Sequence, residues 1–238
     1  MIVRFREGDR IECGFLSDNI IETLDGDECR LEEVELLAPV DPSKVICVGL
    51  NYVKHARELG MDLPEEPIIF LKPPSALIGT GADIMIPSAS REVDYEGELA
   101  VVIGKRSRNV SASEVNGHIL GYACFNDVTA RDLQRKDGQW TRAKSFDTFA
   151  PLGPGVVPVD PGDLKIETRV NGAVRQTSRT SDLIFSVPVL VEFISGIMTL
   201  EPGDVIATGT PPGVGSLHEG DVVEVEIEGL GILQNRVR

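Results

Sequence analysis

The segment EVDYEGELAVV, residues 92–102, has an acidic residue at every second position and then becomes apolar. Because a strand points alternate side chains to opposite faces, Glu92, Asp94, Glu96 and Glu98 would share one face. Like charges on one face repel each other unless a cation lies among them. The segment therefore predicts a strand whose acidic side either faces solvent or holds a cation.

Strand-like runs dominate the chain after this segment. The dipeptide Asn171–Gly172 between two of them is a strong β-hairpin signal. Strands outnumber helices and do not alternate with them regularly, which argues against a doubly wound parallel sheet. We therefore expect an α+β, β-dominated fold. The runs are ILGYACFNDVTA (119–130), GVVPV (155–159), LKIETRVNGAVRQ (164–176), DVIATGT (204–210) and DVVEVEIEGLGILQNRV (221–237).

The remaining segments suggest a few helices and a separate N-terminal part. Helices are predicted for residues 51–60, ending at Gly60, for 111–118 and for the apolar stripe at 188–198. Short apolar pieces separated by turn signals make residues 1–42 a small β-rich segment. The prolines of PVDPSK mark its boundary with a larger domain, residues 43–238.

The composition excludes several classes of protein. The chain has 238 residues, 42% of them hydrophobic, and a formal net charge of −15 at pH 7. So much negative charge disfavours a nucleic-acid partner. We expect a cytoplasmic protein without a membrane segment, because no apolar run approaches the roughly 18 residues that a membrane helix needs. The four cysteines form no C-x-x-C pair, so a zinc knuckle is not expected.

The acidic segment contains half of a candidate cation site. Glu96 and Glu98 share a strand face with a glycine between them, and Asp127 ends another strand-like run. Three carboxylate oxygens suit Mg²⁺, Mn²⁺ or Ca²⁺ rather than zinc. The competing interpretation is a strand that simply turns its acidic side to solvent.

Two further features could carry chemistry. His55 lies three residues before Glu58, so a helix would place both on one face, and the carboxylate would raise the basicity of the imidazole. An exposed histidine with a chance neighbour is the alternative. Lys144 lies among apolar residues and is either a buried cation that faces an anionic substrate or a surface lysine with a buried stem. The loop at 207–215 lacks the G-K-[ST] ending of a phosphate-binding loop, which disfavours phosphoryl transfer.

Five motifs together resemble the fumarylacetoacetate hydrolase superfamily in order and spacing. The resemblance extends from about residue 45 to the C-terminus, roughly four-fifths of the chain, and is far more specific for the superfamily than for a substrate. The motifs are FLKPPSALIG (70–79), DYEGELAVVIGK (94–105), GYACFNDVTARDLQ (121–134), AKSFDTFAPLGP (143–154) and GDVIATGTPPGVG (203–215).

The resemblance implies a fold and a set of site residues. The expected fold is a mixed β-sandwich roll, preceded by the small β-rich N-terminal segment, in a homodimer with one Mg²⁺ or Mn²⁺ per active site. Glu92 and Asp94 are then not direct ligands. The implied metal ligands are Glu96, Glu98 and Asp127; the implied catalytic residues are His55, Glu58 and Lys144; the implied substrate-binding residues are Arg131, Gln134 and Thr210.

The resemblance also implies a class of reaction. It is metal-dependent cleavage of the C–C bond near a 2-oxo acid, as in acylpyruvate hydrolysis or oxaloacetate decarboxylation. Isomerisation of 2-hydroxyhepta-2,4-diene-1,7-dioate is the alternative within the superfamily. A non-catalytic metal-binding scaffold protein is the alternative of another class.

Overall fold

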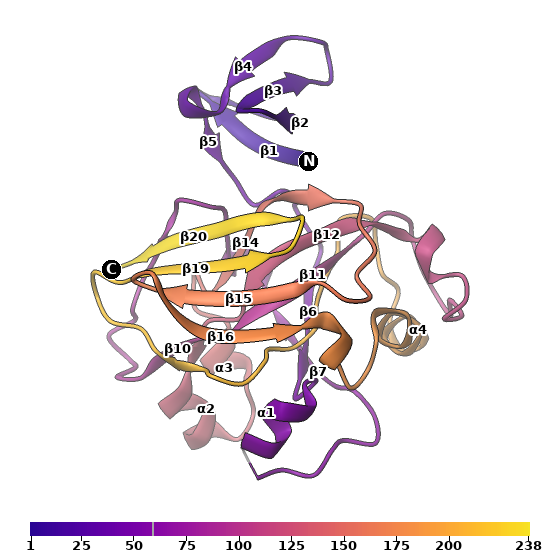
Figure 1. The fold of residues 1–238 in the computed structure, drawn as a ribbon, viewed down its shortest axis with the longest axis vertical. Coiled ribbons are helices and arrows are strands. Elements are labelled where there is room, and N and C mark those ends of the chain that lie inside the picture. Colours follow the sequence, from indigo (N-terminus) through magenta and orange to yellow (C-terminus); the bar gives the residue numbers. More distant parts are fainter. Residues whose placement is uncertain (59) are drawn as a thin grey trace.

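The N-terminal strands form a lobe that stands apart from the rest of the molecule. The computed structural model describes residues 1–58 and 60–238. Five short antiparallel strands enclose the small core of Val3, Phe5 and Ile21, and the lobe projects from the main body (Figure 1). They are β1 (Ile2–Glu7), β2 (Arg10–Ser17), β3 (Ile20–Thr23), β4 (Glu28–Arg30) and β5 (Glu35–Leu36). Strand β1 joins the main body through one pairing, Ile2 opposite Val156.

A central mixed sheet forms the main body. Its strands follow the order β14-β12-β11-β17-β6-β7, with β17 and β6 parallel and the other neighbours antiparallel. Every residue of β11 is buried, because side chains cover both faces of this strand. The strands are β6 (Val45–Gly49), β7 (Ile68–Lys72), β11 (Gly97–Ile103), β12 (Ile119–Asn126), β14 (Ala150–Val157) and β17 (Val205–Ala207).

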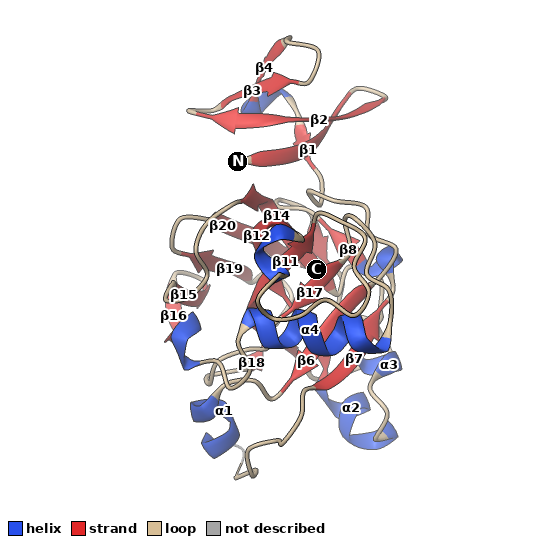
Figure 2. Ribbon diagram, turned by 90° about the vertical axis from the view of Figure 1, so that its right-hand side faces the viewer, coloured by secondary structure: helices blue, strands red, loops and turns tan. Residues whose placement is uncertain are grey.

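A second sheet and one helix cover one face of the central sheet. Leu99 and Val101 of β11 pack there against Val225 of the second sheet and Leu190 of helix α4 (Val187–Ile197). Figure 2 shows α4 lying across the central strands. The second sheet has the order β16 (Ala173–Arg179), β15 (Lys165–Val170), β19 (Val222–Ile227), β20 (Gly231–Val237) and β9 (Asp83–Ile84).

Smaller elements complete the body. A three-stranded sheet places β10 between β13 and β18, and β8 pairs with β14. Three short helices gather at the end of the body opposite the N-terminal lobe (Figures 1 and 2). The strands are β8 (Leu77–Ile78), β10 (Val93–Tyr95), β13 (Thr129–Ala130) and β18 (Gly215–Ser216); the helices are α1 (Val53–Glu58), α2 (Arg131–Asp137) and α3 (Thr141–Lys144). Single 3-10 turns span Leu31–Glu33, Pro74–Ala76, Val115–Gly117 and Thr180–Asp182.

Most local predictions agree with the structure. The sheet-dominated α+β fold is confirmed. The hairpin turn is present: Asn171 and Gly172 have φ values of 52° and 76°, as a tight turn between twisted strands requires. After α1, Gly60 has φ 64°, the amide of Gly60 bonds to the carbonyl of Arg57, and the amide of Met61 bonds to the carbonyl of Ala56. This pair of hydrogen bonds is a Schellman ending, as expected at a glycine.

The helix predicted for residues 111–118 is wrong. Only a 3-10 turn, Val115–Gly117, forms there. The amide of Glu114 bonds to the carbonyl of Ser111 at 2.9 Å, which closes a local turn instead of starting a helix. A segment of this length gains too few hydrogen bonds to offset the cost of helix nucleation. Among the described residues, no helix combines the length and the apolar character that would let it cross a lipid bilayer.

Candidate active site

Three carboxylates meet at the junction of β11 and β12. The antiparallel register pairs Gly97 with Asn126, and the amide of Asp127 bonds to the carbonyl of Glu96 at 2.8 Å. Each of Glu96, Glu98 and Asp127 offers an oxygen within 4.8 Å of the others, and all three side chains are buried. The acidic side of the strand at Glu96 and Glu98 therefore faces the interior rather than solvent.

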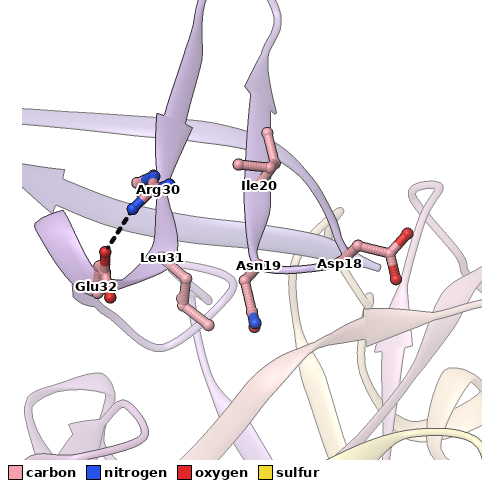
Figure 3. Close-up of a pocket in the computed structure, with 6 residues that line it drawn as sticks. All are labelled: Asp18, Asn19, Ile20, Arg30, Leu31 and Glu32. Atoms are coloured by element: carbon pink, nitrogen blue, oxygen red, sulfur yellow. Dashed lines mark hydrogen bonds and ion pairs between the residues drawn. The ribbon is translucent and has the colours of Figure 1, made fainter.

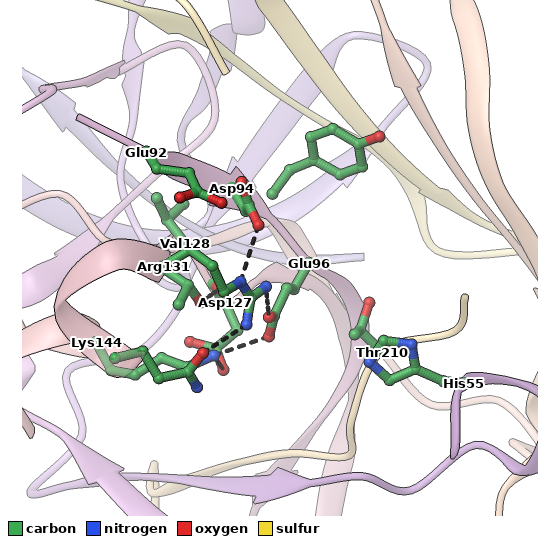
Figure 4. A network of polar contacts seen from close by, with 12 residues as sticks. His55, Glu92, Asp94, Glu96, Asp127, Val128, Arg131, Lys144 and Thr210 are labelled. Atoms are coloured by element: carbon green, nitrogen blue, oxygen red, sulfur yellow. Dashed lines mark hydrogen bonds and ion pairs between the residues drawn. The ribbon is translucent and has the colours of Figure 1, made fainter. Parts of the chain in front are cut away.

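Two buried lysines contact this carboxylate cluster. Lys144, at the end of α3, donates from Nζ to Oε2 of Glu96 at 2.8 Å and to Oδ2 of Asp127 at 2.7 Å (Figure 4). Lys72, at the end of β7, donates to the other oxygen of Asp127 and to the carbonyl of Val128 at 3.0 Å. Both lysine side chains are buried, so Lys144 is the buried cation and not a surface lysine.

Arg131 links the cluster to the preceding acidic residue. At the start of α2, its Nε donates to Asp94 at 2.9 Å, and its Nη2 donates to Oε1 of Glu96. Asp94 also accepts from the hydroxyl of Ser216 at 3.1 Å. Asp94 therefore orients the arginine that contacts Glu96, whereas Glu92 lies further out and pairs with Arg135.

The three carboxylates differ in charge balance. Burial opposes ionisation of Glu96, yet the charges of Lys144 and Arg131 lower its pKa to about 2. Burial, and then the charges of Asp127 and Glu96, raise the pKa of Glu98 well above its usual value. The amide of Gly209 donates to Glu98 at 2.7 Å, and this hydrogen bond offsets only part of the free-energy cost of ionising Glu98. A buried set of oxygen ligands with one carboxylate this poorly compensated fits a hard divalent cation such as Mg²⁺ or Mn²⁺.

His55 and Glu58 form the predicted pair on α1. Nδ1 of His55 lies 3.0 Å from Oε2 of Glu58, which also accepts from the amide of Gly213 at 3.3 Å. His55 is buried, whereas the side chain of Glu58 is 43% exposed. With Nδ1 engaged by the carboxylate, Nε2 is the ring nitrogen left to accept a proton.

The predicted substrate contacts have partners within the protein. Nη1 of Arg131 donates to Oε1 of Gln134 at 2.7 Å, so the guanidinium holds both Gln134 and the carboxylate of Glu96. The hydroxyl of Thr210 donates to the carbonyl of Gly97 at 2.9 Å and accepts from Gln176 at 2.8 Å. Thr210 thus ties its loop to the strand that carries Glu96 and Glu98.

One cavity of about 490 Å³ brings these residues together. It collects side chains from the central sheet, from the loop after β17 and from all three short helices. Of the predicted site residues, only Glu58 is absent from its walls. The predicted residues that line it are His55, Glu96, Glu98, Asp127, Arg131, Gln134, Lys144 and Thr210.

A larger hollow lies on the N-terminal lobe, with a volume of about 580 Å³ (Figure 3). It is lined by residues such as Asn19, Arg30 and Glu32. The last two are exposed and pair with each other at 2.9 Å. None of the predicted site residues lies there, so the smaller cavity is the candidate active site.

Sequence reasoning missed two residues that shape the site. Lys72 lies in the quoted motif FLKPPSALIG, but a lysine before two prolines gives no local signal of burial. Gln176, in the middle of β16, accepts from the amide of Gly97 at 3.0 Å and donates to Thr210 and to the carbonyl of Pro211. The alternation of side chains along the strand could have shown that the amide of Gln176 faces inward, but it could not have identified the partners of that amide.

Comparison with known proteins finds relatives of one family. The sequence model of the fumarylacetoacetate (FAA) hydrolase C-terminal family matches residues 44–238. A mitochondrial oxaloacetate tautomerase from Bos taurus is 48% identical over 219 residues, which are 86% of this chain and 70% of that protein.

Two solved structures are also similar to this chain. A 2-hydroxyhepta-2,4-diene-1,7-dioate isomerase from Mycobacterium marinum aligns with a TM-score of 0.92 and 44% identity, over 99% of this chain and 97% of that one. A fumarylpyruvate hydrolase from Pseudomonas aeruginosa, in complex with Mn²⁺ and pyruvate, aligns with a TM-score of 0.78 and 38% identity, over 84% of this chain and 90% of that one.

Proposed function

The chain belongs to the fumarylacetoacetate hydrolase family, and from this premise we propose that it is a divalent-metal-dependent enzyme that acts on a 2-oxo acid at the C–C bond near the oxo group. One observation carries the proposal. Three buried carboxylates lie in the wall of the same cavity as the histidine of a His–Glu pair. A cation site and a general base are then available to one bound molecule.

The proposed roles follow from the contacts of each side chain. A divalent cation held by the three carboxylates would supply Lewis-acid polarisation of the 2-oxo group. The ammonium of Lys144 stabilises the negative charge that develops on the oxo group as an enolate forms. His55, oriented by Glu58, accepts a proton at Nε2. In acylpyruvate hydrolysis this proton comes from the water that attacks the distal carbonyl, whereas oxaloacetate decarboxylation needs no attacking water.

The polar residues on the cavity wall are proposed to hold the substrate. Gln134 and Thr210 line the cavity with Arg131, which supports contacts to the carboxylate or oxo groups. Arg131 has a second role as a positioning residue, because it contacts Glu96 directly. Apolar surface around these groups excludes water and strengthens their electrostatic interactions.

The relatives favour two related reactions that use the same base. The bovine relative is an oxaloacetate tautomerase, and proton transfer at the carbon next to the oxo group would need only His55 and enolate stabilisation. The Mycobacterium marinum structure favours isomerisation of the seven-carbon dienedioate as the second candidate. A non-catalytic scaffold remains the alternative of another class, and the complete set of His55, Glu58 and Lys144 argues against it.

A metal add-back assay tests the proposal. The full chain is stripped with a chelator, and Mg²⁺ or Mn²⁺ is returned before incubation with oxaloacetate, acetylpyruvate or the heptadienedioate. We expect turnover of at least one substrate only after metal is returned. The matched variant Asp127→Asn should lose both metal binding and turnover. Metal binding without turnover of any 2-oxo acid would favour the scaffold instead.

A further inference from the structure

The pairing of β11 with β17 ends before it reaches the two glutamates of the carboxylate cluster. Its last pair at this end is Ala100 opposite Ala207. Gly97, the residue between the two glutamates, lies beyond that pair and is buried. A buried backbone amide and carbonyl need hydrogen-bond partners, so something other than β17 must supply them here.

Two side chains take the place of the strand at Gly97. The amide of Gly97 donates to Oε1 of Gln176 at 3.0 Å, and its carbonyl accepts from the hydroxyl of Thr210 at 2.9 Å. Nε2 of Gln176 donates to the same hydroxyl at 2.8 Å and to the carbonyl of Pro211 at 2.8 Å. Gly97, Gln176 and Thr210 therefore form a closed ring of hydrogen bonds, which we call the glutamine ring.

The partners of Gln176 fix its side-chain amide in one orientation. A backbone amide can only donate and a backbone carbonyl can only accept, so Gly97 and Pro211 determine which end of the side chain is the oxygen. The oxygen and the nitrogen both have partners, and the side chain is fully buried. Loss of any one of these bonds would leave a buried polar group unpaired, which favours a single arrangement of the ring.

The glutamine ring supports Glu98 from two sides. Glu98 follows Gly97 directly on β11, and its carboxylate accepts from the amide of Gly209 at 2.7 Å. Gly209 precedes Thr210, so the loop that holds the carboxylate is the loop that the ring fastens to the strand. A shift of this loop along β11 would break the ring and move the donor that holds Glu98.

The second sheet closes the space around the ring. Gln176 lies on β16, opposite Thr168 on the neighbouring strand β15. A Cβ on Gly97 would lie 2.1 Å from the hydroxyl of Thr168 and 3.3 Å from Oε1 of Gln176. The glycine between the two glutamates therefore lets the second sheet approach close enough for Gln176 to reach the backbone.

We propose that Gln176 is a positioning residue of the metal site, which holds Glu98 in place for the cation through Gly97 and the loop of Thr210. This inference rests on the proposed function and adds to it a residue that does not line the cavity. Residues that orient metal ligands commonly change metal affinity by about 10- to 100-fold when they are replaced. Gln176 should therefore influence metal binding without contacting the metal.

Replacement of Gln176 by methionine tests the inference. Methionine has a similar length but cannot form the ring, so we expect Gln176→Met to bind Mn²⁺ at least about tenfold more weakly. The affinity is measured by isothermal titration calorimetry on the full chain after treatment with a chelator, and no substrate is needed. Urea unfolding of the same metal-free preparations measures the accompanying change in stability.

Asn235 supplies a matched control in the same sheet. Its buried side-chain amide, on β20, donates to the carbonyls of Gly79 at 2.9 Å and Ala82 at 2.8 Å, and so fastens a different loop. Asn235→Leu should lower the free energy of unfolding, as Gln176→Met does, but should leave the Mn²⁺ affinity unchanged. A purely structural role of Gln176 would make the two variants alike.

Two variants of Thr210 test the same ring if Gln176→Met does not fold. Thr210→Val removes the hydroxyl of the ring, whereas Thr210→Ser keeps it. We expect weaker Mn²⁺ binding by the valine variant and nearly normal binding by the serine variant. Because the hydroxyl and the amide belong to one ring, the affinity losses of Thr210→Val and Gln176→Met should not add in the double variant.

The outcomes separate the inference from the proposed function. Unchanged Mn²⁺ affinity in Gln176→Met or in Thr210→Val would overturn the inference and leave the proposed function standing. Equal losses of affinity in Gln176→Met and Asn235→Leu would also overturn it, because a general loss of stability would then explain both. Failure of the unmodified chain to bind Mn²⁺ would remove the proposed function, and the inference with it.

Discussion

Replacement of Lys72 by methionine should lower the stability of the metal-free protein and raise its affinity for Mn²⁺. Lys72 is buried and contacts a carboxylate that the proposed site assigns to the metal. In the metal-free protein its ammonium therefore neutralises part of the negative charge that a bound metal ion would otherwise neutralise. The two effects have opposite signs, which makes the substitution informative.

The magnitudes follow from the contacts. Removal of one partner from a buried ion pair costs about 3–5 kcal/mol. Asp127 keeps Lys144 at 2.7 Å, so we expect Lys72→Met to lower the free energy of unfolding by roughly half of that range, about 2 kcal/mol. A bound divalent cation replaces the lost charge and no longer meets a neighbouring ammonium. We expect at least about fivefold tighter Mn²⁺ binding, equivalent to about 1 kcal/mol.

Urea unfolding with and without saturating Mn²⁺ measures both effects. The stability loss should shrink by about 1 kcal/mol in Mn²⁺, because tighter binding to the native state adds stability by mass action. Lys44→Met is the matched control, since Lys44 pairs with the buried carboxylate of Asp204 outside the site. Its loss should be the same with and without Mn²⁺.

Two results would refute this reasoning. Weaker Mn²⁺ binding by Lys72→Met would mean that the lysine holds Asp127 in place for the metal rather than competing with it. An identical stability loss with and without Mn²⁺ would mean that the cation does not bind at this carboxylate cluster.

Substitutions at three other places in the molecule have distinct expected outcomes. His55→Gln should lower turnover by about 100- to 10,000-fold with Mn²⁺ affinity unchanged. Glu58→Gln should lower turnover only about two- to fivefold, because the side chain of Glu58 is 43% exposed and its interaction with His55 is screened by solvent. Kinetics and Mn²⁺ titrations are measured in parallel, and a fall in Mn²⁺ affinity would show a structural role instead. In Gly97→Ala the new Cβ would lie 2.1 Å from the hydroxyl of Thr168, so thermal melting should show a free energy of unfolding lower by about 1–3 kcal/mol. Adding Thr168→Ala should restore most of this stability, and an absence of rescue would contradict the clash. Burial opposes ionisation of Asp204, but its hydrogen bonds lower the pKa, so its stabilisation is present at neutral pH and lost as the pH falls through that lowered pKa. Asp204→Ala should lower the free energy of unfolding by about 2–4 kcal/mol at pH 7 and by less in acid. A stability loss that does not change with pH would contradict the role of the ionised carboxylate.

The carboxylate cluster was partly predictable because the geometry of Glu96 and Glu98 is local. The spacing of Glu96 and Glu98 fixes a shared face wherever a strand forms there. The position of Asp127 depends instead on the register between β11 and β12, which no local pattern determines. Spacing alone offered Asp127 as a candidate third ligand but left a solvent-facing acidic strand open, and the resemblance to a family favoured the cation site.

The cations show where sequence reasoning stops. The spacing of His55 and Glu58 was sufficient, because three residues along a helix bring two side chains together. Lys72 reaches Asp127 from a different strand, and only the pairing of β6 with β7 places it there. Burial of a lysine depends on partners distant in the sequence, so a single lysine in an extended segment gives no signal of its own.

The charge of the buried cluster limits the substrate that it can accept. With all four carboxylates ionised, as metal binding would require, they exceed the cations of the described cluster by one; the carboxylates are Asp94, Glu96, Glu98 and Asp127, and the cations are Lys72, Arg131 and Lys144. A divalent cation would reverse this excess to one positive charge. The carboxylate of a bound 2-oxo acid would then neutralise the cluster, so the charge balance favours an anionic substrate.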